Sequence, residues 1–240
     1  MFKNKVVLIT GGSSGIGKAT ALMFAKNNAD IVITYKNNKK GADETINEIK
    51  KLGKTAIAVK VDLINEKQIK KVVNIIIKKF GKIDILVNNV GVYVKGDEWN
   101  KSSNVWIKSL EQNLISMMNI SKYVVKFFLK QKNGIMINIS SRLGLDGVYD
   151  AISYSASKAG VINITQSYAK LLSPFGRANS ICPWAVNSGY WLTAPKYELA
   201  NMLKIMPNHK LIEPEKIAEK IVFLVSDRAK NITGQNFIVE

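Results

Sequence analysis

Hydrophobic positions along the chain alternate between short continuous apolar runs and longer segments in which they recur every three or four residues. Residues 6–9 are Val-Val-Leu-Ile and lead into glycines, which is typical of a strand buried on both faces. Similar runs predict further strands at 31–35, 56–59, 83–87, 135–139, 178–182 and 237–239. Helical periods occupy 19–26, 41–52, 66–80, 103–131, 155–173 and 214–226. This alternation predicts an α/β fold with a parallel sheet covered by helices on both faces.

One stretch departs from the alternation. Residues 184–212 are irregular and aromatic, and we expect them to form a lid over the substrate. Pro214 follows shortly after, where a proline suits the first turn of the last helix. No repeat, low-complexity tract or linker divides the chain, and 240 residues suit one domain. We therefore expect a single domain spanning residues 1–240.

The composition excludes several classes of site. The chain has one cysteine, Cys182, and one histidine, His209, so it holds no internal disulfide, no cysteine-based zinc cluster and no site built on two imidazoles. We expect no metal site, and we expect His209 to be solvated in a polar turn. No apolar run is long enough for a membrane span, and the N-terminal run is too short for a signal peptide. The sequence therefore predicts a soluble, cytoplasmic protein with no membrane partner.

The charge is strongly positive. Lys and Arg number 35 against 18 Asp and Glu, a formal net charge of +17, and only three of the 35 are Arg. A protein that reads nucleic acid usually carries more Arg, and the excess here is scattered, so we favour a solvated lysine surface and expect no nucleic-acid partner. A nucleic-acid binder remains an alternative that a gel shift in rising salt would test. Lys122, Lys126 and Lys130 form one helix stripe, either a solvated face or a docking surface for an acidic partner.

A glycine-rich loop separates the first strand from the first helix. Its sequence is Thr10-Gly-Gly-Ser-Ser-Gly-Ile-Gly17, in which glycines suit a tight turn, the approach of a phosphate and close helix packing. The following helix N-terminus offers free N–H groups to a pyrophosphate. A phosphate-binding loop of the nucleotide-hydrolase type is disfavoured, because Ala19 follows Lys18 where a Ser or Thr must bind magnesium. The loop therefore predicts a bound dinucleotide.

Tyr154 and Lys158 are four residues apart on a predicted helix, so they share one face. A nearby ammonium favours phenolate and is expected to lower the phenol pKa, which suits a general acid or base acting on a carbonyl or alcohol. Ser141 ends a strand and supplies a hydroxyl for the substrate oxygen, while period two turns Ser140 the other way.

Together these segments resemble the short-chain dehydrogenase/reductase family, over about residues 4–240. The matching segments are Gly11-x-x-x-Gly15-x-Gly17, Asp62-Leu63, Asn88-Asn89-Val90-Gly91, Asn113, Ser140-Ser141, Tyr154-x-x-x-Lys158, Pro183 and Ile232-Thr233-Gly234-Gln235. The resemblance implies a doubly wound Rossmann fold with seven parallel strands in the order 3-2-1-4-5-6-7. It implies catalysis by Asn113, Ser141, Tyr154 and Lys158, with Asn113 holding a water that relays protons to Lys158. The implied cofactor contacts are Gly11, Ser13, Ser14, Gly15, Ile16, Gly17, Tyr35, Lys36, Asp62, Leu63, Asn89, Val90, Gly91, Tyr154, Lys158, Pro183, Val186 and Ser188.

The end of the second strand bears on the choice of cofactor. Enzymes of this fold that use NAD place an acidic side chain there, whereas this chain has Tyr35 and then Lys36. Lys36 can pair with a 2′-phosphate, so we expect NADP(H) to be preferred, with NAD(H) possible. Ser14 stands in the glycine loop where relatives that prefer NADP often carry a second basic residue.

The chain departs from the family pattern in a few places. Val90 replaces the usual Ala, Ser188 stands where a Thr often contacts the carboxamide, and Trp184 replaces the Gly after Pro183. We expect Trp184 to affect the backbone geometry and the substrate size. The end at Val239-Glu240 suggests reduced subunit contacts there.

The sequence therefore predicts an NADP(H)-dependent oxidoreductase that transfers a hydride between nicotinamide and a carbonyl or secondary alcohol. The pattern looks most like 3-oxoacyl-acyl-carrier-protein reductases, which makes a 3-oxoacyl thioester a candidate substrate and an acyl carrier protein a candidate partner. A sugar or polyol dehydrogenase, and a cofactor-sensing binding protein without turnover, are the alternatives. Because the helix at 103–131 is apolar on more than one side, we also expect a homodimer or homotetramer.

Overall fold

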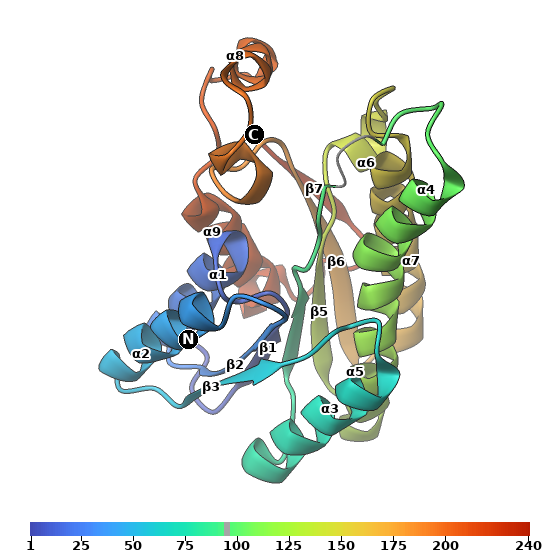
Figure 1. Ribbon diagram of the computed structural model, residues 1–240. Helices are drawn as coiled ribbons and strands as arrows, with labels where there is room; N and C mark the ends of the chain where they lie inside the picture. The colour runs from blue at the N-terminus through green and yellow to red at the C-terminus, as the bar shows by residue number, and fades with distance from the viewer. Residues whose placement is uncertain (94–96) are drawn as a thin grey trace.

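The computed structural model of the protein describes residues 1–93 and 97–240. Its seven strands form one parallel sheet in the order β3-β2-β1-β4-β5-β6-β7, which confirms the predicted strand order (Figure 1). The strands are β1 (Val6–Ile9), β2 (Asp30–Tyr35), β3 (Ala56–Lys60), β4 (Ile85–Asn88), β5 (Gly134–Ile139), β6 (Gly176–Pro183) and β7 (Asn236–Val239). All strands point the same way, so their carboxyl ends meet at one edge of the sheet.

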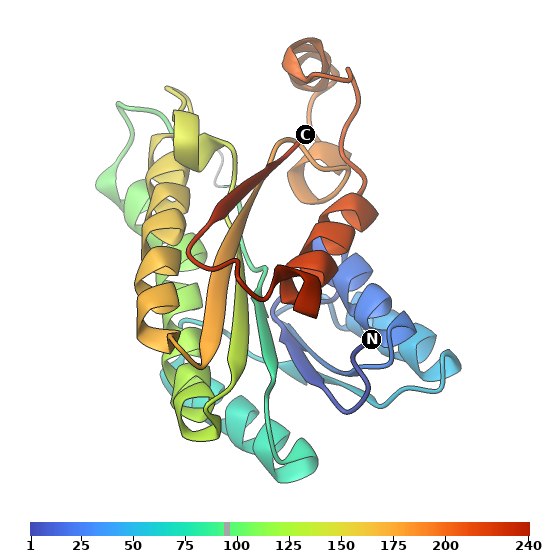
Figure 2. The ribbon, with the colours of Figure 1, turned by 180° about the vertical axis from the view of Figure 1, so that it is seen from behind.

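Helices cover both faces of the sheet, as Figures 1 and 2 show from opposite sides. One layer contains α1 (Gly15–Lys26), α2 (Lys39–Lys51) and α9 (Pro214–Val225). The other contains α3 (Glu66–Phe80), α4 (Ser103–Leu110), α5 (Ser116–Gln131) and α7 (Ile152–Leu172). The short helix α6 (Leu143–Asp146) and the 3-10 turn η3 (Asp227–Ala229) lie in connections. No helix in the described part of the chain is long and apolar enough to cross a membrane.

The sequence of β1 explains the two layers. Val7 and Ile9 are fully buried in one hydrophobic cluster with Phe24 of α1, whereas Val6 and Leu8 join a second cluster on the opposite face. Side chains alternate between the two faces along a strand, so a continuous apolar run is stable only when both faces are covered.

The predicted helix at 103–131 is interrupted. Helix α4 passes through a π-helical turn, η1 (Glu111–Ile115), before α5 begins. A π turn holds one extra residue, which rotates the helix faces before and after it relative to one another. Hydrophobic periodicity does not reveal such an insertion, because both halves keep the same helical period.

The region at 184–212 contains more regular structure than we expected. It holds a 3-10 turn, η2 (Gly189–Leu192), and a ten-residue helix, α8 (Lys196–Ile205), which projects beyond the carboxyl ends of the strands (Figures 1 and 2). Its two ends meet in a parallel bridge between Val186 and Ile212. The Asn187 N–H donates to the Ile212 carbonyl at 2.8 Å, and the Ile212 N–H donates to the Ala185 carbonyl at 2.9 Å. The lid is therefore closed at its base.

Candidate active site

The candidate residues gather where the carboxyl ends of the strands meet. In the glycine loop, Gly11 and Gly15 have φ angles of +68° and +51°, in the left-handed region that favours glycine. A Cβ atom on Gly17 would lie 2.3 Å from the Gly11 carbonyl oxygen, so only glycine lets α1 approach the loop this closely. Gly11 and Gly17 therefore have the turn and packing roles that the motif predicts, and the phosphate contact at Gly15 stays a prediction.

The glycine loop leads directly into the first turn of α1. Ser14 occupies the N-cap position, and within the described residues its side chain makes no capping hydrogen bond. The loop is held from beneath by Asn89, whose Nδ2 donates to the carbonyls of Thr10 at 2.9 Å and Gly11 at 3.2 Å. The Asn89 N–H in turn donates to Thr10 Oγ1 at 2.9 Å. Free helix N–H groups on a fixed loop can bind a pyrophosphate.

At the end of β2, two residues assigned to the adenosine end of the cofactor bind each other. Lys36 Nζ lies 2.6 Å from Asp62 Oδ2, and this hydrogen bond holds the pKa of the Asp62 carboxyl below its ordinary value. Tyr35 is half-buried beside them and Leu63 is buried. An open pocket of about 420 Å³ adjoins the pair, with Asn37, Lys60, Gln68 and Lys71 also in its wall. The sequence does not reveal this ion pair, because its members follow different strands.

Lys158 of α7 is almost completely buried, with 2% of its surface exposed. Its ammonium donates to the Ile139 carbonyl at 3.0 Å and lies 5.7 Å from the centre of the Tyr154 ring. Burial lowers the pKa of Lys158 to about 8, because loss of hydration destabilises the ammonium relative to the neutral amine. The pair thus lies on one face of α7, as the spacing predicts.

Tyr154 lies in the first turn of α7 and shares a hydrogen bond with Ser141 at the end of β5. The expected lowering of its pKa is not found, because burial raises the pKa of Tyr154 and outweighs the Ser141 bond, which lowers it. Ser140 points elsewhere, and its hydroxyl donates to the Lys158 carbonyl at 2.8 Å. In this arrangement Ser141 is the hydroxyl beside the phenol, and Ser140 fixes α7 to β5.

Asn113 lies in the π turn and is 1% exposed. Its Oδ1 accepts from the Val92 N–H at 2.8 Å, and its Nδ2 donates to the carbonyls of Val92 and Ser109, both at 2.9 Å. A Cβ on Gly91 would lie 2.7 Å from Lys158 Nζ and 3.1 Å from Asn113 Oδ1. The missing side chain of Gly91 therefore lets Asn113 and Lys158 approach the same point.

Asp97 is a residue of this site that the sequence analysis missed. It is fully buried, and its carboxylate accepts from the Ser153 N–H at 3.0 Å, the Ser153 hydroxyl at 2.6 Å and the Tyr154 N–H at 2.6 Å. Its carbonyl also accepts from the Ile152 N–H at 3.0 Å. Asp97 thus caps α7 from another segment, because Ala151 stands at the N-cap and has no acceptor in its side chain. That alanine is the sequence signal that indicates an external cap.

A second feature that the sequence analysis missed is a chain of aromatic rings. The Tyr93 ring lies 5.7 Å from the Tyr154 ring in an edge-to-face contact, and Tyr190 lies 4.9 Å from Tyr93. Trp191 follows at 5.4 Å from Tyr190. The rings come from the loop after β4, from α7 and from the lid, so only the folded chain brings them together.

The departures from the family pattern leave the backbone unstrained, but the buried indole N–H of Trp184 has no hydrogen-bond partner among the described residues. Trp184 is half-buried, lies 5.5 Å from the Arg142 guanidinium and is not among the described residues with positive φ, so the backbone there is not strained. Val90 packs beside the glycine loop, 3.1 Å from where a Gly11 Cβ would stand. Ser188 lies beside Gly15, with 2.9 Å between its Cβ and the position of a Gly15 Cβ. The remaining predicted contacts are Ser13 and Ile16 in the loop, and Pro183 and Val186 at the start of the lid.

These residues fit a dinucleotide in an extended pose. The Lys36–Asp62 pair stands at one end, the glycine loop and open helix N-terminus occupy the middle, and Lys158 stands at the other end. Gly15 lacks a side chain, and Ser188 packs against it at the start of the lid.

Comparisons with known proteins agree with this geometry. The family model described as short chain dehydrogenase matches residues 5–196. The 3-oxoacyl-acyl-carrier-protein reductase FabG of Thermotoga maritima is 35% identical over 241 residues, covering 97% of this chain and 95% of that protein. NAD⁺-bound xylitol dehydrogenase superposes with a TM-score of 0.91 at 26% identity, covering 99% of this chain and 98% of that one. An actinorhodin polyketide ketoreductase with NADPH superposes with a TM-score of 0.90 at 26% identity, covering 100% of this chain and 97% of that one. The chain belongs to the short-chain dehydrogenase family of oxidoreductases.

Proposed function

We propose that the protein is an NADP(H)-dependent carbonyl reductase, working in reverse as a secondary-alcohol dehydrogenase. The observation that carries this proposal is the convergence of Ser141, Tyr154, Lys158 and Asn113 beside Gly91. A cofactor-sensing protein without turnover has no need for such an arrangement. The solved relatives with bound NAD⁺ and NADPH support a nicotinamide cofactor.

Each polar group has a distinct task in this proposal. A bound nicotinamide supplies the hydride for reduction. The Tyr154 hydroxyl gives its proton to the substrate oxygen, on which negative charge develops, and the Ser141 hydroxyl donates a hydrogen bond to the same oxygen. Because burial raises the pKa of Tyr154, the phenol is protonated at neutral pH and ready to act as the acid. The Lys158 ammonium then returns a proton to Tyr154 and is itself reprotonated through a water that, as the family resemblance implies, Asn113 holds.

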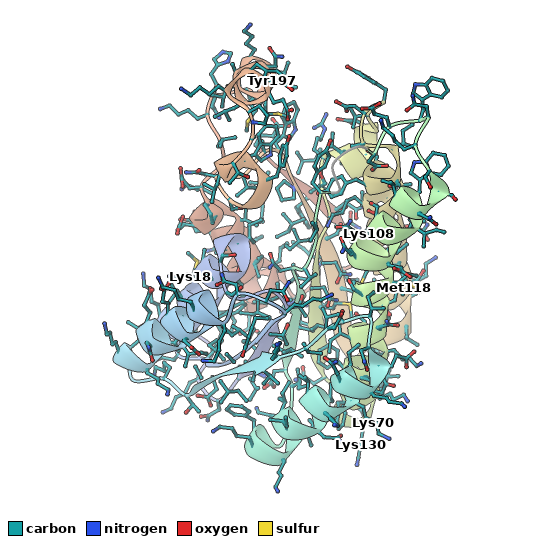
Figure 3. All side chains as sticks on the ribbon, in the orientation of Figure 1. Lys18, Lys70, Lys108, Met118, Lys130 and Tyr197 are labelled. Carbon is teal, nitrogen blue, oxygen red and sulfur yellow. The ribbon has the colours of Figure 1, made fainter. Side chains whose placement is uncertain are left out.

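Two substrate classes follow from the names of relatives. The reductase of Thermotoga maritima suggests a 3-oxoacyl thioester on an acyl carrier protein, and the xylitol dehydrogenase suggests a sugar or polyol. The stripe of Lys122, Lys126 and Lys130, considered as a docking surface for an acyl carrier protein, is poorly placed to deliver a substrate to the site. Lys122 is bound to Glu66 at 2.9 Å, and Lys130 lies roughly 25 Å along the helix from Asn113. Figure 3 shows Lys130 at the end of the molecule opposite Tyr197 of the lid.

The reaction is tested with purified protein, NADPH and a panel of ketones, thioesters and sugars, by following NADPH absorbance. Tyr154→Phe keeps the ring and should lower kcat by several orders of magnitude while cofactor binding persists. Ser141→Ala should lower kcat about 10²–10³-fold, as expected for loss of one donor to an oxyanion.

Ser140→Ala is the matched control, since that hydroxyl binds the Lys158 carbonyl. It should cost less activity than Ser141→Ala. A Tyr154→Phe protein that retained a tenth of the activity would place the proton donor elsewhere.

A further inference from the structure

Four aromatic rings form a continuous series from the reacting phenol to the lid. Tyr154 contacts Tyr93, Tyr93 contacts Tyr190, and Tyr190 contacts Trp191, with ring centres 4.9–5.7 Å apart. Two of the three contacts are edge-to-face and the third is tilted, so each ring presents an edge or a face to the next. The rings link α7, the loop after β4 and the turn η2 on the approach to Tyr154.

The hydroxyl groups of Tyr93 and Tyr190 each have a hydrogen-bond partner within the protein. The Tyr93 hydroxyl donates to the Asp150 carbonyl at 3.5 Å, and the Tyr190 hydroxyl donates to the Glu198 carboxylate. Burial raises the pKa of Tyr93 to about 12, so this ring stays uncharged at physiological pH. The rings of this series therefore meet one another through uncharged aromatic surface.

We propose that Tyr93, Tyr190 and Trp191 bind a planar ring of the substrate, and that the preferred substrates are ketones whose carbonyl adjoins such a ring. The proposal rests on the proposed carbonyl reduction and narrows its substrate class. A ring that enters between these side chains replaces one aromatic contact with another, so little is lost when Tyr93 and Tyr190 separate. A saturated acyl chain gains no such contacts.

Sugars and polyols are disfavoured for a different reason. Each of their hydroxyl groups needs a hydrogen-bond partner when it leaves water, and an unpaired one carries a desolvation cost. The Tyr93 and Tyr190 hydroxyls already donate their protons within the protein, so this series offers fewer hydrogen-bonding groups than a polyol has hydroxyls. Of the carbonyl compounds considered above, those with a flat apolar ring match this wall best.

Acetophenone and 2-octanone provide a matched test, because both are methyl ketones with the same number of heavy atoms and differ in the ring. We expect kcat/KM with NADPH to be at least about tenfold higher for acetophenone, the size expected from one or two aromatic contacts. Acetoacetyl-coenzyme A and xylulose complete the panel. Ligand-observed NMR of the two ketones with cofactor-free protein reports binding without turnover. The signals of acetophenone should broaden more than those of 2-octanone.

Four variants assign the preference to the rings. Tyr93→Leu and Tyr190→Leu should bring the acetophenone/2-octanone ratio to within about threefold of one, whereas Tyr93→Phe, which keeps the ring, should preserve it. The control is Tyr149→Leu, because Tyr149 is 81% exposed and outside the series. Its ratio should match wild type. A thermal melt of each variant identifies any that fail to fold, and the Phe variant then carries the comparison.

The outcomes separate this proposal from the reaction on which it rests. A ratio near or below one, or a high ratio that both Leu variants retain, overturns the ring-binding proposal while carbonyl reduction stands. Faster turnover of acetoacetyl-coenzyme A or xylulose than of acetophenone overturns it as well. If no carbonyl compound is reduced, the proposed reaction is wrong, and the NMR comparison alone decides whether the rings bind an aryl group.

Discussion

Tyr154 and Lys158 respond to the same burial in opposite directions. Burial raises the pKa of the phenol and lowers that of the ammonium to about 8, because it disfavours the charged form of each group. Near pH 7 the phenol is thus protonated, as reduction of a ketone requires. Oxidation of an alcohol needs the phenolate instead, so we expect that direction to speed up as pH rises.

The Lys158 shift predicts how stability depends on pH in the cofactor-free protein. Its pKa is near 10.4 when unfolded and about 8 when folded, so between these values the unfolded chain binds more protons and stability rises with pH. Lys158→Met removes this dependence. In urea unfolding from pH 8 to 10, the free energy of unfolding of wild type should rise relative to that of the variant by roughly 1 kcal/mol per pH unit. Burial also raises the pKa of the Cys182 thiol, and Lys158 partly opposes this in the wild type, so both proteins are compared in a Cys182→Ala background. A constant difference across this range would contradict the burial effect.

The Lys36–Asp62 pair predicts the cofactor preference. The two side chains are 58% and 34% exposed, and an exposed ion pair contributes at most about 1 kcal/mol, so a 2′-phosphate can take Lys36 from Asp62. Lys36→Ala should lower the NADPH/NADH ratio of kcat/KM by about 10- to 100-fold. Lys39→Ala, which removes an exposed lysine bound to Asp43, should leave it unchanged. A wild-type preference for NADH would show that the assignment is wrong.

At the residue scale, the sequence reveals side chains that act through fixed spacing and misses those that act through contact. Tyr154 and Lys158 share a helix face by period alone, and Ser141 lies two residues after a strand. Asp97 and Tyr93 lie 57 and 61 positions from Tyr154 along the chain, and no period relates them to it. The raised pKa of Tyr154 was missed for the same reason, because burial is a property of the folded surroundings.

Among the elements, helix α7 depends on a residue outside itself. Asp97→Asn keeps the shape of the side chain but replaces one carboxylate oxygen with an NH₂ group. That group cannot accept a hydrogen bond, so either the Ser153 N–H or the Tyr154 N–H loses its acceptor. We expect a loss of stability of about 1–3 kcal/mol and, because Tyr154 shifts, a fall in kcat of about 10- to 100-fold with unchanged NADPH affinity. Hydrogen exchange at the Tyr154 amide should speed up.

Glu98→Gln is the control, since that neighbouring carboxylate is exposed and binds only Lys101 among the ion pairs of the described chain. It should leave kcat and the exchange rate unchanged. An Asp97→Asn protein with wild-type kcat would show that the cap has no part in placing the phenol.

The π turn marks the limit of pattern-based prediction for elements. Residues 103–131 were predicted as one helix, and the structure keeps helical backbone throughout but inserts a residue at 111–115. That insertion lets Asn113 point inward to the Val92 backbone while Val124 and Phe128, farther along, still face the core. A hydrophobic pattern gives the period of a helix and does not give its phase across such an insertion.

At the scale of the whole molecule, the order of the strands was predictable and the surfaces were not. Alternation of buried runs and helical periods fixes the fold class, and family motifs fix the order. The apolar residues expected to face a partner along 103–131 are largely used within the subunit, since Val124, Val125 and Phe128 are buried. Other apolar side chains remain exposed, among them Ile107, Ile115 and Leu129 along 103–131 and Leu171 on α7.

We expect those exposed side chains to be covered by a second copy of the chain. Light scattering at micromolar concentration should give twice or four times the 26.6 kDa of the subunit. Leu171→Glu, at a position 51% exposed on α7, should reduce this mass, because a charge is costly to bury in an interface. Ile75→Glu on α3, at a position 45% exposed, is the control and should leave the mass unchanged. A wild-type mass of one subunit would contradict the prediction.

The bridge between Val186 and Ile212 has a consequence for how such a protein can diversify. Because the two ends of the lid are joined to each other at its base, the residues between them can change in length or sequence without altering the span that the sheet must close. Substrate range can thus evolve, or be engineered, by exchanging the lid while Ser141, Tyr154 and Lys158 stay in place. A lid transplanted between these two positions should bring its donor's selectivity with it and leave the host's strand ends in place.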